Sequence, residues 1–296
     1  MYIGSLQQGH LDCLGNLREL EIIVVKGNGE RLQNGPQQAH STFPGQLVAL
    51  PNLKVVHITS LMPGIGELSK HIARLSCLEE LHLIHCQVTK LPEEATLLSR
   101  LHSLQVSNAV SDDGLVLPDL ALLPRMRRLA LHNGFSEVPT ELVNCTHLTS
   151  LSLHGFGLQE LPNGPFLSNL KDLELQDSDL RPCLLKEAKH LQRLYCMTNE
   201  LHWLSDPDMN LAMAADALRN LQQLHVNWDV AVLDAKSMQR CLQLNQLLSS
   251  TRASSNKVAP GGCVVRIVPE DNWRRHELML PWASHEYLPS RFWNTL

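Results

Sequence analysis

The chain has 296 residues, of which 57 are leucine, while aromatic residues make up only 4%. Leucine is used about twice as often as in ordinary proteins, which indicates a core assembled many times from one small unit. The 25 basic and 30 acidic residues leave a net charge of −5, which excludes the strongly basic field expected of a protein that binds nucleic acid or an anionic membrane.

No apolar run approaches the roughly 18 residues that a membrane-spanning helix needs, and the mean hydropathy is −0.11. The opening segment MYIGSLQQGH has neither the basic nor the apolar region of a secretory signal. The eight cysteines include no Cys-x-x-Cys pair, which indicates reduced thiols. We therefore expect a cytoplasmic protein that does not bind a membrane.

One pattern recurs: a leucine, two variable residues, a second leucine, one variable residue and a third apolar residue. It is clearest in LEELHLIHCQVTKLP from Leu78 and LTSLSLHGFGLQELP from Leu148. Such alternation predicts a short strand with one buried face. The third apolar position falls at Ile22, Ile58, Leu83, Val106, Leu131, Leu153, Leu175, Cys196 and Val226. Seven of these nine frames are spaced by 21–25 residues, a period typical of solenoid repeats.

These residues resemble leucine-rich repeat proteins. The resemblance implies an α/β fold, a solenoid of about nine irregular repeats. It would be a curved horseshoe with parallel strands on its concave face and helices or loops on its convex face. Leu-Pro and Val-Pro pairs after three of the turns are similar to intracellular plant-type repeats. The stretch LQELPNGPFLSNLKDLEL is also similar to green-lineage F-box leucine-rich repeat proteins.

Along the chain, residues 1–16 are expected to form an N-terminal cap and residues 17–233 the solenoid. A segment rich in Gly, Gln and Pro, residues 26–46, predicts a mobile insertion between the first two strands. Cys86 occupies the turn position of its repeat and Cys196 a core strand position, so we expect both to be buried.

A second insertion, residues 206–220, predicts a helix that Asp206 or Asp208 can cap. Its core-facing residues are expected to be Leu211, Ala215 and Leu218.

Residues 234–250 predict an amphipathic helix that closes the array, and residues 251–262 a flexible link. Residues 263–296 form a C-terminal cap or tail, which begins with a possible final strand in GCVVRIVP. The tail holds five of the thirteen aromatic residues, which favours capping of the solenoid end; a docking segment for a partner is the alternative.

Residues between the apolar strand positions point to the predicted concave face. One such position reads Glu21, His57, His82, Gln105, Ala130, Ser152, Glu174, Tyr195 and His225 along the repeats. One place beyond the third apolar position are His132 and His154, whose imidazoles can touch if adjacent strands lie about 4.8 Å apart. A metal at this pair is a minor alternative, because metal sites need three or four ligands.

We predict that the concave face binds a protein partner of unknown identity, and that binding weakens as its histidines protonate below about pH 6.5. Taken singly, each histidine has the alternative of a solvated surface residue. The predicted contact residues are His82, His85, Arg128, His132, His154, Asp172, Glu174, Asp177, Tyr195, His225 and Trp228.

No hydrolase, zinc-protease, dinucleotide or phosphate-loop motif occurs, so we expect a non-catalytic, monomeric module with no cofactor and no metal. One alternative is the substrate-recognition part of an F-box ubiquitin ligase receptor. Against it, only 16 residues precede the first repeat frame, whereas a helical F-box needs about 40. The other alternative is the sensing repeat region of a plant-type immune receptor.

Overall fold

A computed structural model describes residues 2–3, 17–26, 45–60, 65–107, 115–132, 138–154, 161, 164–176, 185, 187–197, 210–228, 239–240, 242–244, 246–248 and 264–269. These residues form two compact units. The first unit holds the described residues up to 132 together with 139–147, and the second holds 138 and the described residues from 148 onward. The predicted mobile insertion and flexible link lie almost entirely outside the described residues, as does the aromatic part of the tail.

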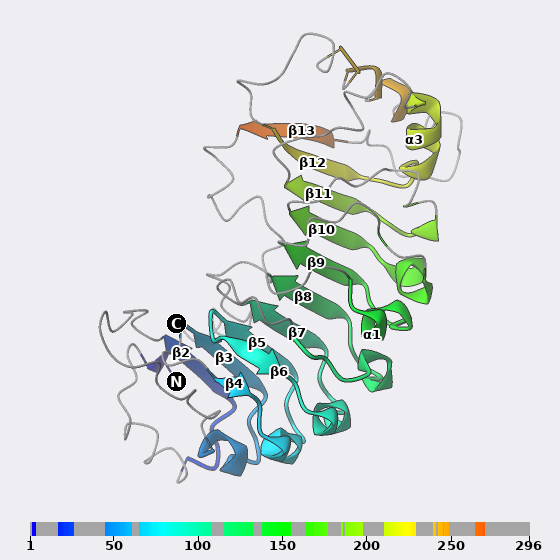
Figure 1. Cartoon of the computed structure of the whole chain (residues 1–296). Helices are drawn as coiled ribbons and strands as arrows, with labels where there is room; N and C mark the ends of the chain where they lie inside the picture. The colour runs from blue at the N-terminus through cyan, green and yellow to red at the C-terminus, as the bar shows by residue number, and fades with distance from the viewer. Residues whose placement is uncertain are drawn as a thin grey trace. The chain divides into compact units, whose positions relative to one another are not determined.

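In the first unit, parallel strands lie side by side in the order β1-β2-β3-β5-β7-β8, as Figure 1 shows. The strands are β1 (Tyr2–Ile3), β2 (Ile22–Lys26), β3 (Val55–Thr59), β5 (Glu80–Ile84), β7 (Ser103–Ser107) and β8 (Arg128–His132). Two further strands, β4 (Gly66–Glu67) and β6 (Val88–Lys90), pair with each other in a separate short sheet.

The second unit has the same construction, with parallel strands in the order β9-β10-β11-β12-β13. These strands are β9 (Ser150–His154), β10 (Asp172–Gln176), β11 (Arg193–Met197), β12 (Gln223–Trp228) and β13 (Val264–Pro269). The final strand β13 pairs with β12 in the same register as the other strands.

Short helices precede most strands. In the first unit they are η2 (Leu47–Ala49), η3 (Lys70–Arg74), η4 (Glu93–Leu97), η5 (Leu120–Leu122) and α1 (Thr140–Val143). In the second unit they are η6 (Pro165–Asn169) and α3 (Leu211–Ala217). Side chains cap several of them: Ser69 accepts a hydrogen bond from the His71 N–H, and Asp119 accepts one from the Ala121 N–H.

Helix α3 lies within the segment 206–220, but its cap differs from the prediction. The side chain of Asn210, rather than Asp206 or Asp208, accepts hydrogen bonds from the N–H groups of Ala212 and Met213 at 2.9 and 3.3 Å. The cap is set by the residue that immediately precedes the helical dihedrals, and that residue is Asn210.

The core includes the second and fourth residues of the five-residue strands together with apolar residues of the short helices. Leu81, Leu104 and Leu129 are register partners on consecutive strands and are all buried. Phe166 of η6 is fully buried in the second unit. Each layer of leucines therefore packs against the layers of the neighbouring repeats, which is the architecture of a leucine-rich repeat solenoid.

The turn position of the third frame shows how the backbone leaves a strand. Cys86 is fully buried, and its thiol donates to the carbonyl oxygens of Ile58 and Ile84 at 3.4 and 3.3 Å. Both neighbours of this cysteine, His85 and Gln87, adopt positive φ. The thiol adds its hydrogen bonds beside this tight turn, where the Ile84 carbonyl also accepts one from the Ser60 N–H at 2.7 Å. Within the described part of the chain, no helix is long and apolar enough to cross a bilayer.

Candidate functional site

The first, third and fifth residues of each strand point away from the leucine core, and we call this side of each sheet the strand face. In the first unit, the first position runs Ile22, Val55, Glu80, Ser103 and Arg128 in register. The third position runs Val24, His57, His82, Gln105 and Ala130. The strand face thus carries the polar residues that the repeat pattern singled out.

The structure corrects the first repeat frame. The register partner of His57 on β2 is Val24, so Glu21 precedes the strand instead of standing beside His57. Ile23 is fully buried, whereas Leu17, the first leucine of the predicted frame, is 41% exposed. The run of four apolar residues from Ile22 fits the alternating pattern in more than one register, and only packing against β3 selects one.

Most of the predicted contact residues are buried. This group is His82, His132, His154, Asp172, Glu174 and Tyr195, none of which is more than 8% exposed. The prediction treated them as accessible recognition residues, with solvated surface histidines as the alternative, and the structure matches neither description. On the strand face, side chains at the same position of adjacent strands lie close together. They therefore contact one another rather than water.

The structure describes the remaining predicted contact residues to different extents. Arg128 keeps 24% of its side chain exposed, and His85 is half-buried. His225 and Trp228 lie on β12, where only their backbone is described, and Asp177 lies outside the described residues. Of the named set, Arg128 therefore offers the clearest accessible charge.

Two histidines of the first unit stack on each other. The rings of His57 and His82 lie 5.5 Å apart between centroids, with 27° between their planes. The Nε2 atom of His57 is 3.0 Å from the hydroxyl of Thr59. Burial lowers the pKa of His57 to about 4. Burial, with the nearby His57, Arg128 and His102, also holds the pKa of His82 well below its ordinary value.

These pKa shifts change the predicted pH response. The prediction placed protonation of the strand-face histidines just below about pH 6.5. A histidine whose pKa is about 4, as for His57, stays neutral through most of that range in the folded protein, because the interior cannot solvate the imidazolium. Acid therefore acts on the folding of this part of the first unit before it changes the charge of its strand face.

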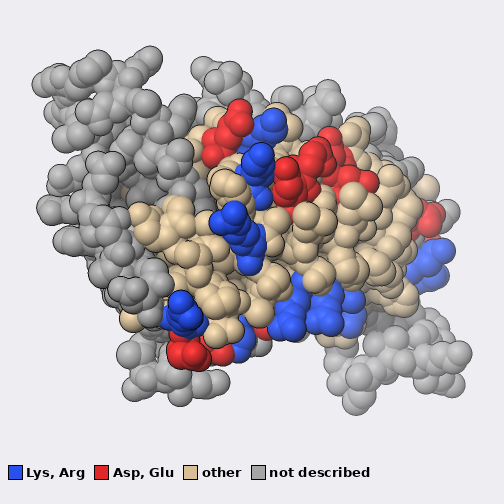
Figure 2. Space-filling model, turned by 90° about the horizontal axis from the view of Figure 1, so that it is seen from below, with Lys and Arg blue, Asp and Glu red and all other residues tan. Residues whose placement is uncertain are grey.

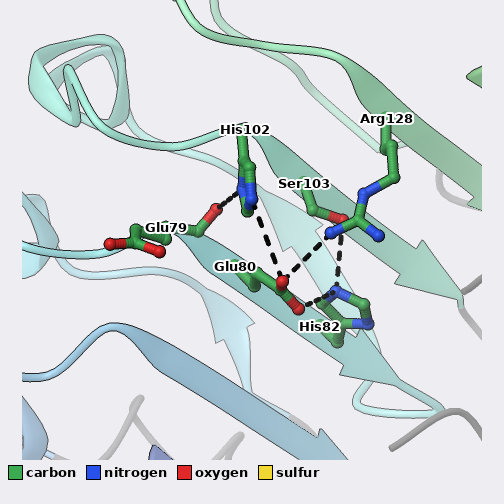
Figure 3. A network of polar contacts seen from close by, with 6 residues as sticks. All are labelled: Glu79, Glu80, His82, His102, Ser103 and Arg128. Atoms are coloured by element: carbon green, nitrogen blue, oxygen red, sulfur yellow. Dashed lines mark hydrogen bonds and ion pairs between the residues drawn. The ribbon is translucent and has the colours of Figure 1, made fainter. Parts of the chain in front are cut away.

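Glu80 is the centre of a polar network on the same face, drawn in Figure 3. Its carboxylate accepts a hydrogen bond from Nη2 of Arg128 at 3.0 Å, although Arg128 lies two strands away. His82 and His102 approach it with their Nε2 atoms at 3.8 and 3.9 Å. Ser103 lies on β7, the strand between β5 and β8, and its hydroxyl is 3.3 Å from Nε2 of His82. Glu80 itself is only 6% exposed.

Glu80 and Arg128 hold the same position in their repeats. A buried carboxylate is stable only if cationic or hydrogen-bonding groups surround it. Arg128 meets that need, and its guanidinium is held in one place at the accessible margin of the strand face. Arg128 is among the predicted contact residues but Glu80 is not, although both stand at the second variable position of the repeat pattern.

The second unit carries a comparable pair at the same strand position. Arg193 donates from Nε and Nη2 to the two carboxylate oxygens of Asp172, at 2.5 and 2.7 Å. Asp172 is 8% exposed, whereas 44% of the Arg193 side chain is exposed. The hydrogen bonds to Asp172 are the main cause of the raised pKa of Arg193. Arg193 is not among the predicted contact residues. The sequence feature that points to it is an arginine at the strand position where the preceding repeat has an acid, Asp172.

His154 of the second unit lies next to an acid. Its Nε2 atom is 3.1 Å from Oε1 of Glu174 and 3.1 Å from the hydroxyl of Ser152. The predicted contact between His132 and His154 would join the two units, and it stays a prediction. Among the described residues, no three histidine, cysteine or acidic side chains gather as ligands for a metal ion.

Two of the described cysteines, Cys145 and Cys196, are not activated for nucleophilic chemistry. Burial raises the pKa of Cys196 to about 12, and burial together with Asp119 raises the pKa of Cys145 to about 12. Their thiols therefore stay protonated at neutral pH and act as small apolar groups. Leucine-rich repeat folds are usually non-catalytic, and the packing of these thiols fits that use.

The outer surface offers two other features. Leu97 and Leu122, at the ends of η4 and η5, are 66% and 60% exposed. On the face seen in Figure 2, basic and acidic side chains form small separate patches rather than one field of a single sign.

No protein-family profile matches the chain. The volume-regulated anion channel subunit LRRC8B of Homo sapiens is 29% identical over 158 residues, and the Mus musculus protein is 28% identical. The match covers 49% of this chain and 19% of the human protein, so the chain spans only about a fifth of the length of these relatives.

Solved structures of leucine-rich repeat proteins also resemble the chain. A leucine-rich repeat protein of Leptospira interrogans is 21% identical, with a TM-score of 0.46, and the match covers 80% of this chain and 67% of that one. The internalin inlF of Listeria monocytogenes is 16% identical, with a TM-score of 0.48, covering 77% of this chain and 60% of that one. The in-register strands and repeated leucine layers give the chain the fold of a leucine-rich repeat solenoid, and part of the chain is distantly similar to LRRC8B.

Proposed function

We propose that the chain is a non-catalytic, cytoplasmic module that, as a monomer, binds a protein partner through the strand face of its solenoid. One observation carries the proposal. In each unit, a buried carboxylate at the first strand position holds an arginine that stays partly exposed, Glu80 with Arg128 and Asp172 with Arg193. An extended strand face is also the usual binding surface of solenoid proteins.

The physical reason lies in pre-organisation. A free arginine loses side-chain entropy when it binds a partner, which weakens binding by about 0.5–1.5 kcal/mol per immobilised side chain. A guanidinium already held by two hydrogen bonds, as in Arg193, has lost much of that freedom before the partner arrives. Arginine is also among the residues that most often dominate binding at protein interfaces.

Position-dependent cross-linking tests the proposal. A photoreactive amino acid would be placed in the full chain at Gln223, the half-exposed register partner of Arg193, or at His102, which immediately precedes β7. The control positions are Leu97 and Leu122, which are more exposed but belong to the short helices. Each variant would be irradiated in an extract of the source cells and its cross-linked proteins identified.

We expect one partner to be cross-linked from both strand-face positions and not from the control positions. Cross-links that arise only from Leu97 and Leu122 would contradict the proposal and place binding on the helical side. Far-ultraviolet circular dichroism melts of all four variants check that each one is folded.

The two narrower resemblances stay predictions. None of the relatives described above is an F-box protein or a plant-type nucleotide-binding immune receptor. What LRRC8B assembles into is a property of that protein.

A further inference from the structure

Basic side chains gather at one edge of the first unit, where β7 and β8 begin and where the chain leaves α1. They come from three successive turns of the solenoid. We call this group the basic edge, and it consists of Arg100, His102, Arg125, Arg127, Arg128 and His147.

Repeat geometry brings these residues together. Arg100 and Arg125 each stand immediately before the first core residue of their repeat, so they occupy matching places on adjacent turns. The backbone N–H of Arg127 donates to the carbonyl of His102 at 3.0 Å. The Arg127 guanidinium reaches the carbonyl of His147 at 3.3 Å, which ties the third turn to the second.

The charges that solvent can reach on this edge are mainly positive. Four of its members are exposed, namely Arg100, Arg125, Arg127 and His147. His102 is 37% exposed. The nearby acids are less accessible, because Glu80 is buried in its pair with Arg128 and Glu79 is only half-exposed. A chain with a net charge of −5 thus presents a compact cationic surface here.

We infer that the basic edge binds an acidic segment of the protein partner. The inference rests on the proposed function and adds the chemistry of what is bound. Guanidinium groups match carboxylates in a planar, two-bond geometry, and such charge-assisted hydrogen bonds are stronger than neutral ones. Four arginines on two adjacent turns, with His147 on a third, fit several carboxylates spaced along one extended segment.

An acidic protein segment fits better than nucleic acid. A nucleic-acid surface needs a broad basic stripe that follows the phosphate backbone, whereas the basic edge covers three turns of a chain with an isoelectric point near 6.3. Glu79 would also repel a continuous row of phosphates at this edge. A short peptide can place its carboxylates only where guanidinium groups stand.

Fluorescence anisotropy with the full chain and a labelled oligoglutamate peptide tests the inference at low salt. The test variant is R100E/R125E, which reverses two exposed charges of the basic edge and leaves the Glu80–Arg128 pair intact. The matched control is K70E/K90E, which makes the same change of net charge at exposed lysines of η3 and β6. Thermal melts establish that both variants fold.

We expect the peptide to bind the wild type and K70E/K90E with similar affinity, and R100E/R125E about tenfold more weakly, because each reversal replaces an attraction to the peptide with a repulsion. Equal weakening in both variants would overturn the inference, because it would reveal only a net-charge effect. Tighter binding of a single-stranded oligonucleotide of equal charge would also overturn it. If the peptide fails while cross-links still arise from the strand face, the acidic partner is wrong and the proposed function stands.

Discussion

In the first unit, His57 and His82 stack on each other and Nε2 of His82 is 3.8 Å from the carboxylate of Glu80, whereas in the second unit Nε2 of His154 lies 3.1 Å from the carboxylate of Glu174. Both arrangements bury imidazoles on the strand face. The stacked histidines stand at the third position of their strands and His154 stands at the fifth. A proton added to the stack would put a cation against a second imidazole and near Arg128 and His102, which makes the strand face of the first unit sensitive to acid.

The carboxylate–arginine pairs differ in a second way. Glu80 reaches Arg128 across an intervening strand and through a mostly buried network, whereas Asp172 and Arg193 are register partners at the accessible margin. Interactions in a buried network respond strongly to the loss of one member, while solvent screens a pair at the margin.

Removing the Phe166 side chain should have the largest effect and should be confined to the second unit. Phe166 is fully buried, and replacing such a residue with alanine destabilises by about 3–5 kcal/mol. Because each repeat contacts only its neighbours, hydrogen exchange should accelerate in β9, β10 and β11 more than in β3 and β5. Equal acceleration in both units would mean that they unfold as one.

Acidification should destabilise the first unit more than the second. The folded-state pKa of His57 is about 4, below the ordinary value of about 6.5, so the unfolded chain binds more protons between these two pH values. Stability is therefore fully present above pH 6.5 and is lost as pH falls towards 4, by up to about 3 kcal/mol for His57 alone. His82, whose pKa is also lowered, should add to this loss.

Hydrogen exchange of β3 and β5 at a series of pH values measures the effect, after correction for the intrinsic rate. His57→Phe keeps an aromatic ring in the stack and removes the titrating group, so it should flatten the pH dependence of these strands. Strands that keep full protection down to pH 5 would contradict the role given to the stack.

The change Glu80→Gln should destabilise the first unit by about 1.5–3 kcal/mol, the usual range for hydrogen bonds to charged groups. The amide keeps the shape of the side chain but removes the charge that holds Arg128. Urea unfolding gives the free energy. A loss below about 0.5 kcal/mol would show that surrounding groups hold Arg128 without the carboxylate.

Asp172→Asn should have the smallest effect, about 1 kcal/mol or less, because Arg193 is accessible to solvent and its pair is screened. The loss should shrink further as salt is added, whereas the loss from Glu80→Gln should change little. Urea unfolding at two salt concentrations compares the variants. If Asp172→Asn proves as costly as Glu80→Gln, exposure does not distinguish the two pairs.

The strand positions and leucine layers could be predicted from the sequence because the spacing of apolar residues indicates which side chains are buried on folding. That rule failed at Ile22, where four consecutive apolar residues fit more than one register and packing against β3 selected Val24 as the partner of His57. It also failed at the cap of α3, because apolar spacing does not identify the residue at which the backbone turns helical, which is next to Asn210.

The candidate site divides in the same way. Sequence alone determined that polar residues recur at the non-leucine strand positions, since a strand must alternate its side chains between two faces. Which of these residues contact one another depends on the tertiary structure, because Glu80 and Arg128 are 48 residues apart in the chain. The tertiary structure also determines that His57, His82, His132 and His154 are buried while Arg128 and Arg193 stay accessible, since burial depends on neighbours that parallel strand pairing brings within contact distance.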